Sequence, residues 1–226
     1  MIDQIFGPHR APYLQWLPEV GVGFFDCDHY NEGKTAEVYD ESYFAKYRAM
    51  AATDTALALN AFRASLVLSH LPAALDKSVC LLDVGIGDGA FLSTLHPHRT
   101  WLEPFGCDIN PAGVAWLIET GQLGSYDVDQ HFDVVTFWDS LEHFRDPRVP
   151  LRAAADLVFV SIPIFANADH VVRSKHFRKD EHFWYFTREG FQQFAHGEGF
   201  DTVDILMTEV ALGREDIETF VLRRRS

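Results

Sequence analysis

From residue 78 to its end, the chain alternates short apolar runs with amphipathic segments. The runs are apolar at almost every position, which is typical of parallel strands that helices bury on both faces. One helix is clearly marked, because Asn110-Pro111 caps its start and Gly121 follows its end, and another opens at Asp146-Pro147. The pattern predicts a doubly wound α/β sheet whose first four strands are 79–84, 105–107, 132–138 and 157–162.

The last 40 residues follow a different pattern. Thr187 precedes a short helix with Phe191 and Phe194 on one face, and two strand-like runs follow, 202–207 and 217–222. A short connection through Gly213 joins them, so we expect an antiparallel C-terminal hairpin at the end of the parallel sheet.

The first third of the chain lacks this alternation. Residues 1–38 carry scattered prolines and glycines, which predicts loop with one short strand over 20–25. Between 41 and 71 the apolar spacing becomes helical until Pro72 ends it, so one or two helices are expected. We therefore divide the chain into an N-terminal helical extension or lid, 1–78, and one ligand-binding domain, 79–226.

Composition narrows the class of protein. The 226 residues are 47% hydrophobic and 23% charged, and no apolar run is long enough to span a bilayer, so we expect a cytoplasmic protein without a membrane partner. Three cysteines without a C-x-x-C pair predict neither disulfides nor a zinc knuckle. A net charge of −14 makes duplex nucleic acid an improbable partner and favours a small acceptor.

A glycine-rich loop over residues 81–89 is the strongest chemical signal. Gly85, Gly87 and Gly89 directly follow a predicted strand, where glycine permits a sharp turn and close approach of a ligand. With Ala90, this spacing also satisfies the dinucleotide pattern G-x-G-x-x-A, so the glycines do not identify the cofactor. Asp83 would repel a pyrophosphate at the mouth of the loop, whereas it attracts the ammonium and sulfonium groups of S-adenosylmethionine.

A second carboxylate follows the next strand. Asp108 lies 19 residues after Gly89, at the position where an acid accepts the ribose hydroxyls of an adenosine. The same residue could instead stabilise the start of the helix that Asn110-Pro111 opens. The spacing favours ribose binding but does not distinguish S-adenosylmethionine from NAD.

Five segments in order, DVGIGDG, GCDINPAGVAWL, FDVVTFWDSLEHFRDP, VFVSIPIF and HFWYFTREGFQQFAHGEGF, resemble the motifs of class I S-adenosylmethionine-dependent methyltransferases. The resemblance covers residues 79–226 and is closest to ubiquinone-biosynthesis O-methyltransferases and to bacteriophage-encoded methyltransferases, which YDESYFAKY also resembles. It implies a Rossmann-like, mostly parallel seven-stranded sheet, and a host-cytoplasmic location if the chain is viral.

The resemblance also implies which residues bind the cofactor. Asp83 with the three glycines would hold its methionine part, and Asp108 with Ile109 its adenosine. Near the sulfonium it places Trp138, Asp139 and Ser140. From the extension, Tyr43 could contact the methionine carboxylate of the cofactor, or its helical stripe with Tyr39 and Tyr47 could serve packing. An acidic residue beside the adenine is usual in the family, but only GQLGSYDVDQ is available here, so we assign neither Asp127 nor Asp129.

Methyl transfer from a sulfonium needs alignment and exclusion of water rather than a protein nucleophile. A hydroxyl acceptor would benefit from a base, for which His143 and His182 are the candidates. His182 in DEHFWYF could equally belong to a wall of aromatic packing.

Asp139, Glu142 and His143 are spaced to share one face of a helical turn and could bind Mg²⁺. The similar ubiquinone-pathway enzymes carry a comparable acid-x-x-Glu-His group that binds a divalent cation, although many relatives bind none. We favour a network at the start of a helix, in which His143 meets a carboxylate, and assign no metal.

The basic stretch RSKHFRK, residues 173–179, follows the predicted strand 157–162. It could grip an anionic acceptor, or it could be a solvated loop paired with Asp180 and Glu181. The residues leave both readings open.

The predicted function is S-adenosylmethionine-dependent methylation of a small-molecule or nucleotide-like acceptor. The main alternative is a regulatory S-adenosylmethionine-binding protein of the same fold. Asp83 opposes a nicotinamide-dependent enzyme. WDSL stands where amino-methylating DNA enzymes have N-P-P-Y or D-P-P-Y, and the Pro-Cys pair of enzymes that methylate cytosine carbon is missing. The sequence therefore disfavours the standard DNA methyltransferases. The oligomeric state is left unassigned.

Overall fold

The computed structural model describes residues 13–33, 41–71, 78–127 and 131–225. Its strands are β1 (Gln15–Leu17), β2 (Val22–Phe24), β3 (Val79–Val84), β4 (Leu102–Cys107), β5 (Phe132–Trp138), β6 (Ala154–Pro163), β7 (Trp184–Phe186), β8 (Phe200–Leu206) and β9 (Ile217–Arg224). Its α-helices are α1 (Cys27–Asn31), α2 (Glu41–Met50), α3 (Asp54–His70), α4 (Ala90–Thr94), α5 (Pro111–Thr120), α6 (Arg148–Leu151), α7 (Ala168–Arg173), α8 (Arg188–Gly197) and α9 (Thr208–Ala211), with 3-10 turns at His96–His98 and Leu141–His143.

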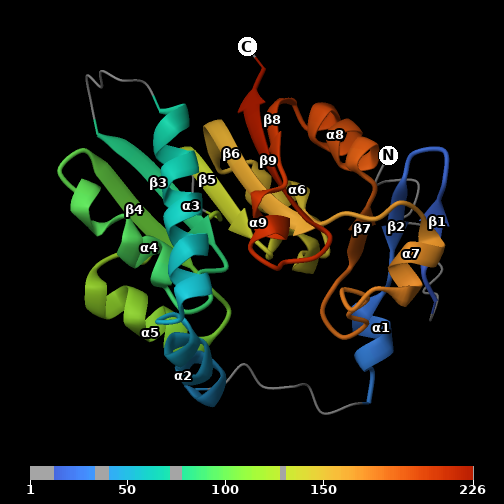
Figure 1. Ribbon diagram of the computed structural model, residues 1–226, viewed down its shortest axis with the longest axis horizontal. Coiled ribbons are helices and arrows are strands. Elements are labelled where there is room, and N and C mark those ends of the chain that lie inside the picture. The colour runs from blue at the N-terminus through green and yellow to red at the C-terminus, as the bar shows by residue number, and fades with distance from the viewer. Residues whose placement is uncertain (1–12, 34–40, 72–77, 128–130, 226) are drawn as a thin grey trace.

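The central sheet has the strand order β4-β3-β5-β6-β9-β8 (Figure 1). Strands β3 to β6 are parallel, and β9 runs antiparallel to both β6 and β8. The predicted doubly wound α/β fold with an antiparallel C-terminal pair is therefore confirmed. After β3 the chain moves to β4 at one edge of the sheet and then returns to β5 on the other side of β3, so the strand order reverses between β3 and β5. Ligands of such sheets bind at this point, outside the carboxyl ends of the strands.

Two hydrophobic clusters cover the two faces of this sheet. Leu81, Val134 and Phe159 pack on one face with residues of α3 and α4. Leu82, Val135 and Val158 point to the other face, where they join α8 and the strands β2 and β7. Successive strand residues thus alternate between two buried clusters, which explains why the strands are apolar at nearly every position.

The predicted count of seven strands was wrong for the described part of the chain, where the central sheet has six. The place beside β4 is taken by a single parallel bridge between Gly106 and Leu123. Leu123 lies between the left-handed Gly121, which ends α5, and Gly124, so little extended chain is available for a further strand.

A second, antiparallel sheet of order β1-β2-β7 lies apart from the first (Figure 1, right) and was not expected from the sequence. Val22 pairs with Phe186 and Phe24 with Trp184, so β2 forms a sheet with a strand about 160 residues further along the chain. The strand expected over 20–25 is β2, and the helices expected over 41–71 are α2 and α3. Elements on both sides of residue 78 share the two hydrophobic clusters.

No helix in the described ranges is both long enough and apolar enough to cross a membrane.

Candidate functional site

The glycine loop follows β3 and turns through three left-handed residues, Gly85, Gly87 and Gly89, with φ of 81°, 56° and 74°. Each has a different neighbourhood. A Cβ on Gly85 would lie 2.8 Å from Ser140 Cβ, and one on Gly89 would lie 2.7 Å from the Trp116 ring, whereas one on Gly87 would meet nothing within 4 Å. The first and third glycines therefore permit internal packing, and the middle one borders open space.

Asp108 ties this loop to the next strand. Its Oδ2 accepts a hydrogen bond from the Gly87 amide at 3.1 Å, and its Oδ1 accepts one from the Asn110 amide at 2.8 Å. Asn110, rather than Asp108, caps α5 by accepting from the Ala112 amide. Burial raises the pKa of Asp108, and its backbone hydrogen bonds act in the opposite direction. Next to it, the Ile109 side chain is 80% exposed, as a side chain that faces a ligand would be.

Asp83 lies deeper than the sequence indicated. We expected it at the mouth of the loop, but its side chain is 1% exposed between β3 and β5, where it accepts a 2.6 Å hydrogen bond from Thr136 Oγ1. Burial raises its pKa to about 7, although the Thr136 hydrogen bond and the charge of Arg63 oppose the shift. Asp83 is thus a buried carboxyl group beneath the loop, and it is partly protonated near pH 7.

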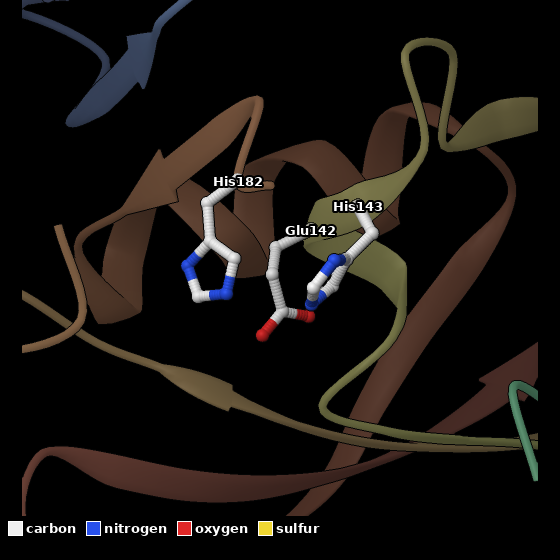
Figure 2. Close-up of side chains that lie close together, drawn as sticks. All are labelled: Glu142, His143 and His182. Carbon is white, nitrogen blue, oxygen red and sulfur yellow. The ribbon is translucent and has the colours of Figure 1, made fainter. Parts of the chain in front are cut away.

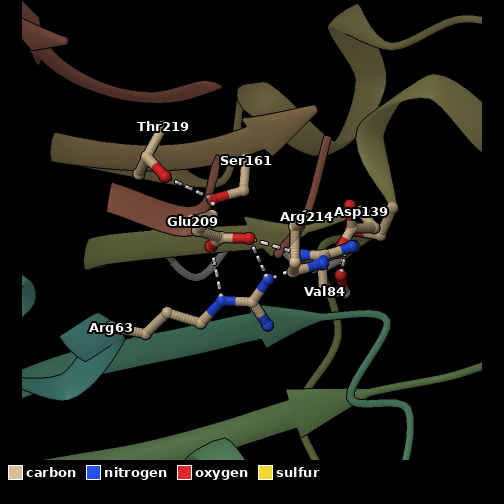
Figure 3. A network of polar contacts seen from close by, with 8 residues as sticks. Arg63, Val84, Asp139, Ser161, Glu209, Arg214 and Thr219 are labelled. Atoms are coloured by element: carbon tan, nitrogen blue, oxygen red, sulfur yellow. Dashed lines mark hydrogen bonds and ion pairs between the residues drawn. The ribbon is translucent and has the colours of Figure 1, made fainter. Parts of the chain in front are cut away.

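At the carboxyl end of β5, Asp139 has the uncommon left-handed φ of 56° and lies in a network of charges (Figure 3). Its carboxylate contacts Arg214 at 2.8 Å and Arg63 at 3.3 Å. Burial opposes its ionisation, but the two guanidinium groups outweigh that effect and hold the pKa of Asp139 below its ordinary value. The carboxylate is therefore charged and held by arginines.

The same network contains Glu209, which is fully buried. Arg63 Nε donates to it at 2.9 Å, Arg214 also contacts it, and Ser161 Oγ donates at 2.9 Å. Arg63 further lies 4.8 Å from the centre of the Trp138 ring. None of these partners was predicted, because Arg63 and Glu209 stand 146 positions apart and neither has a local sequence signal.

Two of the residues predicted near the sulfonium have structural contacts of their own. The Trp138 ring is buried edge-on against Phe91, at a centroid distance of 5.2 Å. Ser140 Oγ donates to the Val84 carbonyl, which closes the end of β5 onto the glycine loop. The described side chains of Trp138 and Ser140 thus shape the loop, and their contact with a cofactor stays a prediction.

The two predicted histidines come together, as Figure 2 shows. The rings of His143 and His182 lie 4.6 Å apart at an angle of 74°, and Glu142 lies beside them. Desolvation lowers the pKa of His143 to about 4 and that of His182 well below its ordinary value, and desolvation raises the pKa of Glu142. Glu142 and His182 are buried and His143 is partly buried, so all three groups favour their neutral forms.

The predicted group of Asp139, Glu142 and His143 on one helical face does not form. The turn after β5 is a 3-10 turn, Leu141–His143, and Asp139 precedes it in the left-handed region. Its side chain therefore turns to the arginines. His182, from a segment 39 positions further on, takes the third place beside Glu142 and His143.

The basic loop 173–179 finds partners close by. Lys175 lies 3.5 Å from Glu215, Arg173 lies 3.8 Å from Asp169, and Arg178 contacts Glu181 at 2.6 Å. Of the two partners expected for an ion-paired loop, Glu181 takes part, whereas Glu215 and Asp169 were not expected; binding of an anionic acceptor stays a prediction.

Asp129 and the three tyrosines of the predicted helical stripe fall wholly or partly outside the described residues. Tyr43 belongs to α2, but its side chain is not among those described. Asp129 lies outside the described residues. Asp127 is described and exposed, with its amide bonded to Ser125 Oγ.

The chain was compared with known proteins. The methyltransferase domain family matches residues 55–205, which is well over half of the chain. The ubiquinone biosynthesis O-methyltransferases of Yersinia pestis strain Pestoides F and of Yersinia pseudotuberculosis strain YPIII are each 30% identical to it over 139 residues, which cover 53% of this chain and 57% of theirs. The alignment therefore spans little more than half the length of these curated relatives.

Solved structures share the fold at low identity. Magnesium protoporphyrin IX methyltransferase from Synechocystis PCC 6803, solved with bound SAH, has a TM-score of 0.60 at 13% identity, with 82% of this chain and 96% of that one covered. The 1,6-didemethyltoxoflavin-N1-methyltransferase of Burkholderia thailandensis has a TM-score of 0.55 at 13% identity, with 82% and 84% covered. With the family match over residues 55–205, the chain belongs to the methyltransferase domain family.

Proposed function

We propose that this protein transfers a methyl group from S-adenosylmethionine to a small-molecule acceptor. The observation that carries the proposal is the backbone at Gly87, which we call the ledge. It borders open space where the strand order reverses, and its amide donates to Asp108. Relatives named as methyltransferases, one of them solved with bound SAH, support the choice of cofactor.

The described residues fit such a cofactor. A Cβ at Gly87 would occupy space that a ligand can use, Asp108 lies beside it, and the exposed Ile109 offers an apolar surface for an adenine ring. Below the loop, Asp83 supplies a carboxylate that a cationic group would hold in its charged form. When bound, the cofactor supplies a methyl group on a positively charged sulfur, which is an excellent leaving group.

The protein's own task is then alignment and exclusion of water, which requires no nucleophilic side chain. We propose that the acceptor lies beyond the end of β5, next to His143 and His182, and that it presents a hydroxyl, as the names of the Yersinia relatives support. The ion pairs of loop 173–179 favour a neutral acceptor over an anionic one.

Residues 1–78 belong to this proposal as a cover for the domain. Arg63 in α3 reaches the charge network at the end of β5, so at least this helix helps to build the site rather than lying apart from it. The three cysteines, Cys27, Cys80 and Cys107, form no disulfide, which supports action in a reducing, cytoplasmic compartment.

Calorimetry with S-adenosylmethionine, S-adenosylhomocysteine and NAD tests the cofactor. The Asp108 carboxylate would accept hydrogen bonds from the ribose hydroxyls, and Asp108→Ala removes it. Because hydrogen bonds to a charged group are the stronger ones, we expect the affinity for S-adenosylmethionine to fall about 10- to 100-fold. Asp156→Ala, near the amino end of β6 with 53% of its side chain exposed, is the control and should bind like the parent.

Transfer of a labelled methyl group to a panel of hydroxylated small molecules tests the reaction. Tight cofactor binding without transfer to any acceptor would favour a regulatory binding protein of the same fold. Binding of NAD in preference to S-adenosylmethionine would overturn the proposal.

A further inference from the structure

Glu142, His143 and His182 form a cluster that the cofactor does not account for. One ligand atom from each of the three side chains can be chosen so that all lie within 4.8 Å of one another. Figure 2 shows the Glu142 carboxylate and both imidazole rings converging on one region. Two of the three residues come from the turn after β5, and the third comes from the segment that leads into β7.

The cluster contains polar atoms that have no hydrogen-bond partner. Glu142 is 2% exposed, yet neither of its carboxylate oxygens is hydrogen-bonded, and the buried Nδ1 of His182 has no partner either. Buried polar groups are almost always satisfied, because an unmet one is costly. Three such atoms in one cluster indicate that a bound species belongs between them.

The backbone holds the cluster in place from both sides. The Phe183 amide donates to the Glu142 carbonyl at 2.9 Å, and the His182 amide donates to the Arg178 carbonyl at 2.8 Å. The Trp184 indole donates to the Phe144 and Arg145 carbonyls. The two segments are thus joined directly beside the converging side chains, which is the preorganisation that a ligand site needs.

We propose that Glu142, His143 and His182 bind a divalent transition-metal ion of the zinc class. Two imidazoles and one carboxylate are a common ligand set for Zn²⁺ with a further position open. Ligand atoms bonded to zinc at about 2.0–2.2 Å lie about 3–4 Å apart, so small side-chain rotations would close the site. His143 is the least buried of the three and offers the way in.

This site differs from the magnesium cluster that residue spacing suggested. The Asp139 carboxylate is paired with Arg63 and Arg214, so the His182 imidazole takes its place as the third ligand. Replacing a carboxylate by an imidazole changes the preferred ion from Mg²⁺ to Zn²⁺. If the proposed methyl transfer is correct, the open position would hold the acceptor oxygen and favour its deprotonated form. That role rests on the proposed function, whereas metal binding does not.

The test is titration of the full chain, first treated with a chelator, with Zn²⁺ by calorimetry and with Co²⁺ by visible absorption. We expect one ion per chain and an intense Co²⁺ band typical of low coordination number. Glu142→Gln, His143→Gln and His182→Gln should each weaken binding by about 100-fold or more, because loss of even an outer-shell partner costs 10- to 100-fold.

The matched controls are His176→Gln and His196→Gln, which remove histidines outside the cluster, and Asp139→Asn, which removes the acid of the spacing-based cluster. The two histidine variants should keep Zn²⁺ affinity within about threefold, Asp139→Asn should still bind one ion per chain, and circular dichroism checks that every variant is folded. Absence of saturable binding in the parent overturns the proposal, as does loss of binding in Asp139→Asn but not in His182→Gln. Because cofactor affinity is measured separately, failure of the metal site and failure of the proposed function are distinguishable.

Discussion

The two halves of the site are built differently. On the side of β3 and β4, the glycines and Asp108 lie within 24 residues of one another and are joined by hydrogen bonds between the loop and the next strand. On the side of β5, the charge network joins three separate segments, through Asp139, Arg63 and the pair Glu209 and Arg214, and Glu142 and His143 meet His182 from a fourth. A ledge for a cofactor can thus be encoded locally, whereas the charged environment next to it depends on the completed fold.

The comparison predicts that the second region is sensitive to loss of any one partner. Glu209→Ala would remove the 2.9 Å carboxylate partner of Arg63 and leave two guanidinium groups sharing Asp139 in a largely buried place, so we expect the free energy of unfolding to fall by about 3–5 kcal/mol. Urea denaturation followed by circular dichroism measures it.

Glu215→Ala is the matched control, because Glu215 pairs with Lys175 while 74% of its side chain is exposed. Such a pair contributes less than about 1 kcal/mol. Equal losses in the two variants would show that the Glu209 network is no more than a surface ion pair.

The buried carboxylate under the loop should couple stability to pH. Because the pKa of Asp83 is raised from 3.8 to about 7 in the folded protein, its protonated form is favoured on folding. Its contribution is therefore fully present below pH 3.8 and is lost as the pH rises through 7.

Asp83→Asn removes that coupling and can keep a hydrogen bond to Thr136. Between pH 4 and pH 8 the stability of the variant relative to the parent should therefore rise, by up to about 4 kcal/mol. Urea titrations of both proteins across this range measure it, and S-adenosylmethionine affinity should fall in the variant. A difference that stays flat with pH would mean that Asp83 ionises normally in the fold.

Two neighbouring glycines test the local half of the site. Gly85→Ala combines a left-handed φ with a 2.8 Å approach to Ser140, so it should destabilise the protein by about 2–3 kcal/mol. Gly87→Ala has the φ penalty without a clash and should cost only about 1 kcal/mol.

Cofactor affinity should respond in the opposite order. Gly87→Ala places a methyl group on the open ledge and should weaken binding more than its small effect on stability suggests. Thermal unfolding and calorimetry on the same two variants separate the effects. If Gly87→Ala bound S-adenosylmethionine like the parent, the ledge would not be the cofactor's place.

Several features were readable from the sequence because neighbouring residues determine them. The runs 79–84 and 132–138 coincide with β3 and β5, since a strand buried on both faces is apolar at nearly every position. Helix α5 begins after Asn110 and ends before Gly121, as the capping residues indicated. The glycine loop could be located for the same reason, because left-handed turns need glycine wherever they occur.

Other features were decided only by tertiary structure. The pairing of β2 with β7, the arginines around Asp139 and the meeting of His143 with His182 join residues that are far apart along the chain. The depth of Asp83 also followed from its pairing with Thr136 on β5. Spacing along the chain determines which residues share a strand, a turn or a helix. Which charge lies beside which, and hence which carboxylate is held by arginine and which is left for an ion, depends on how the strands and helices pack together.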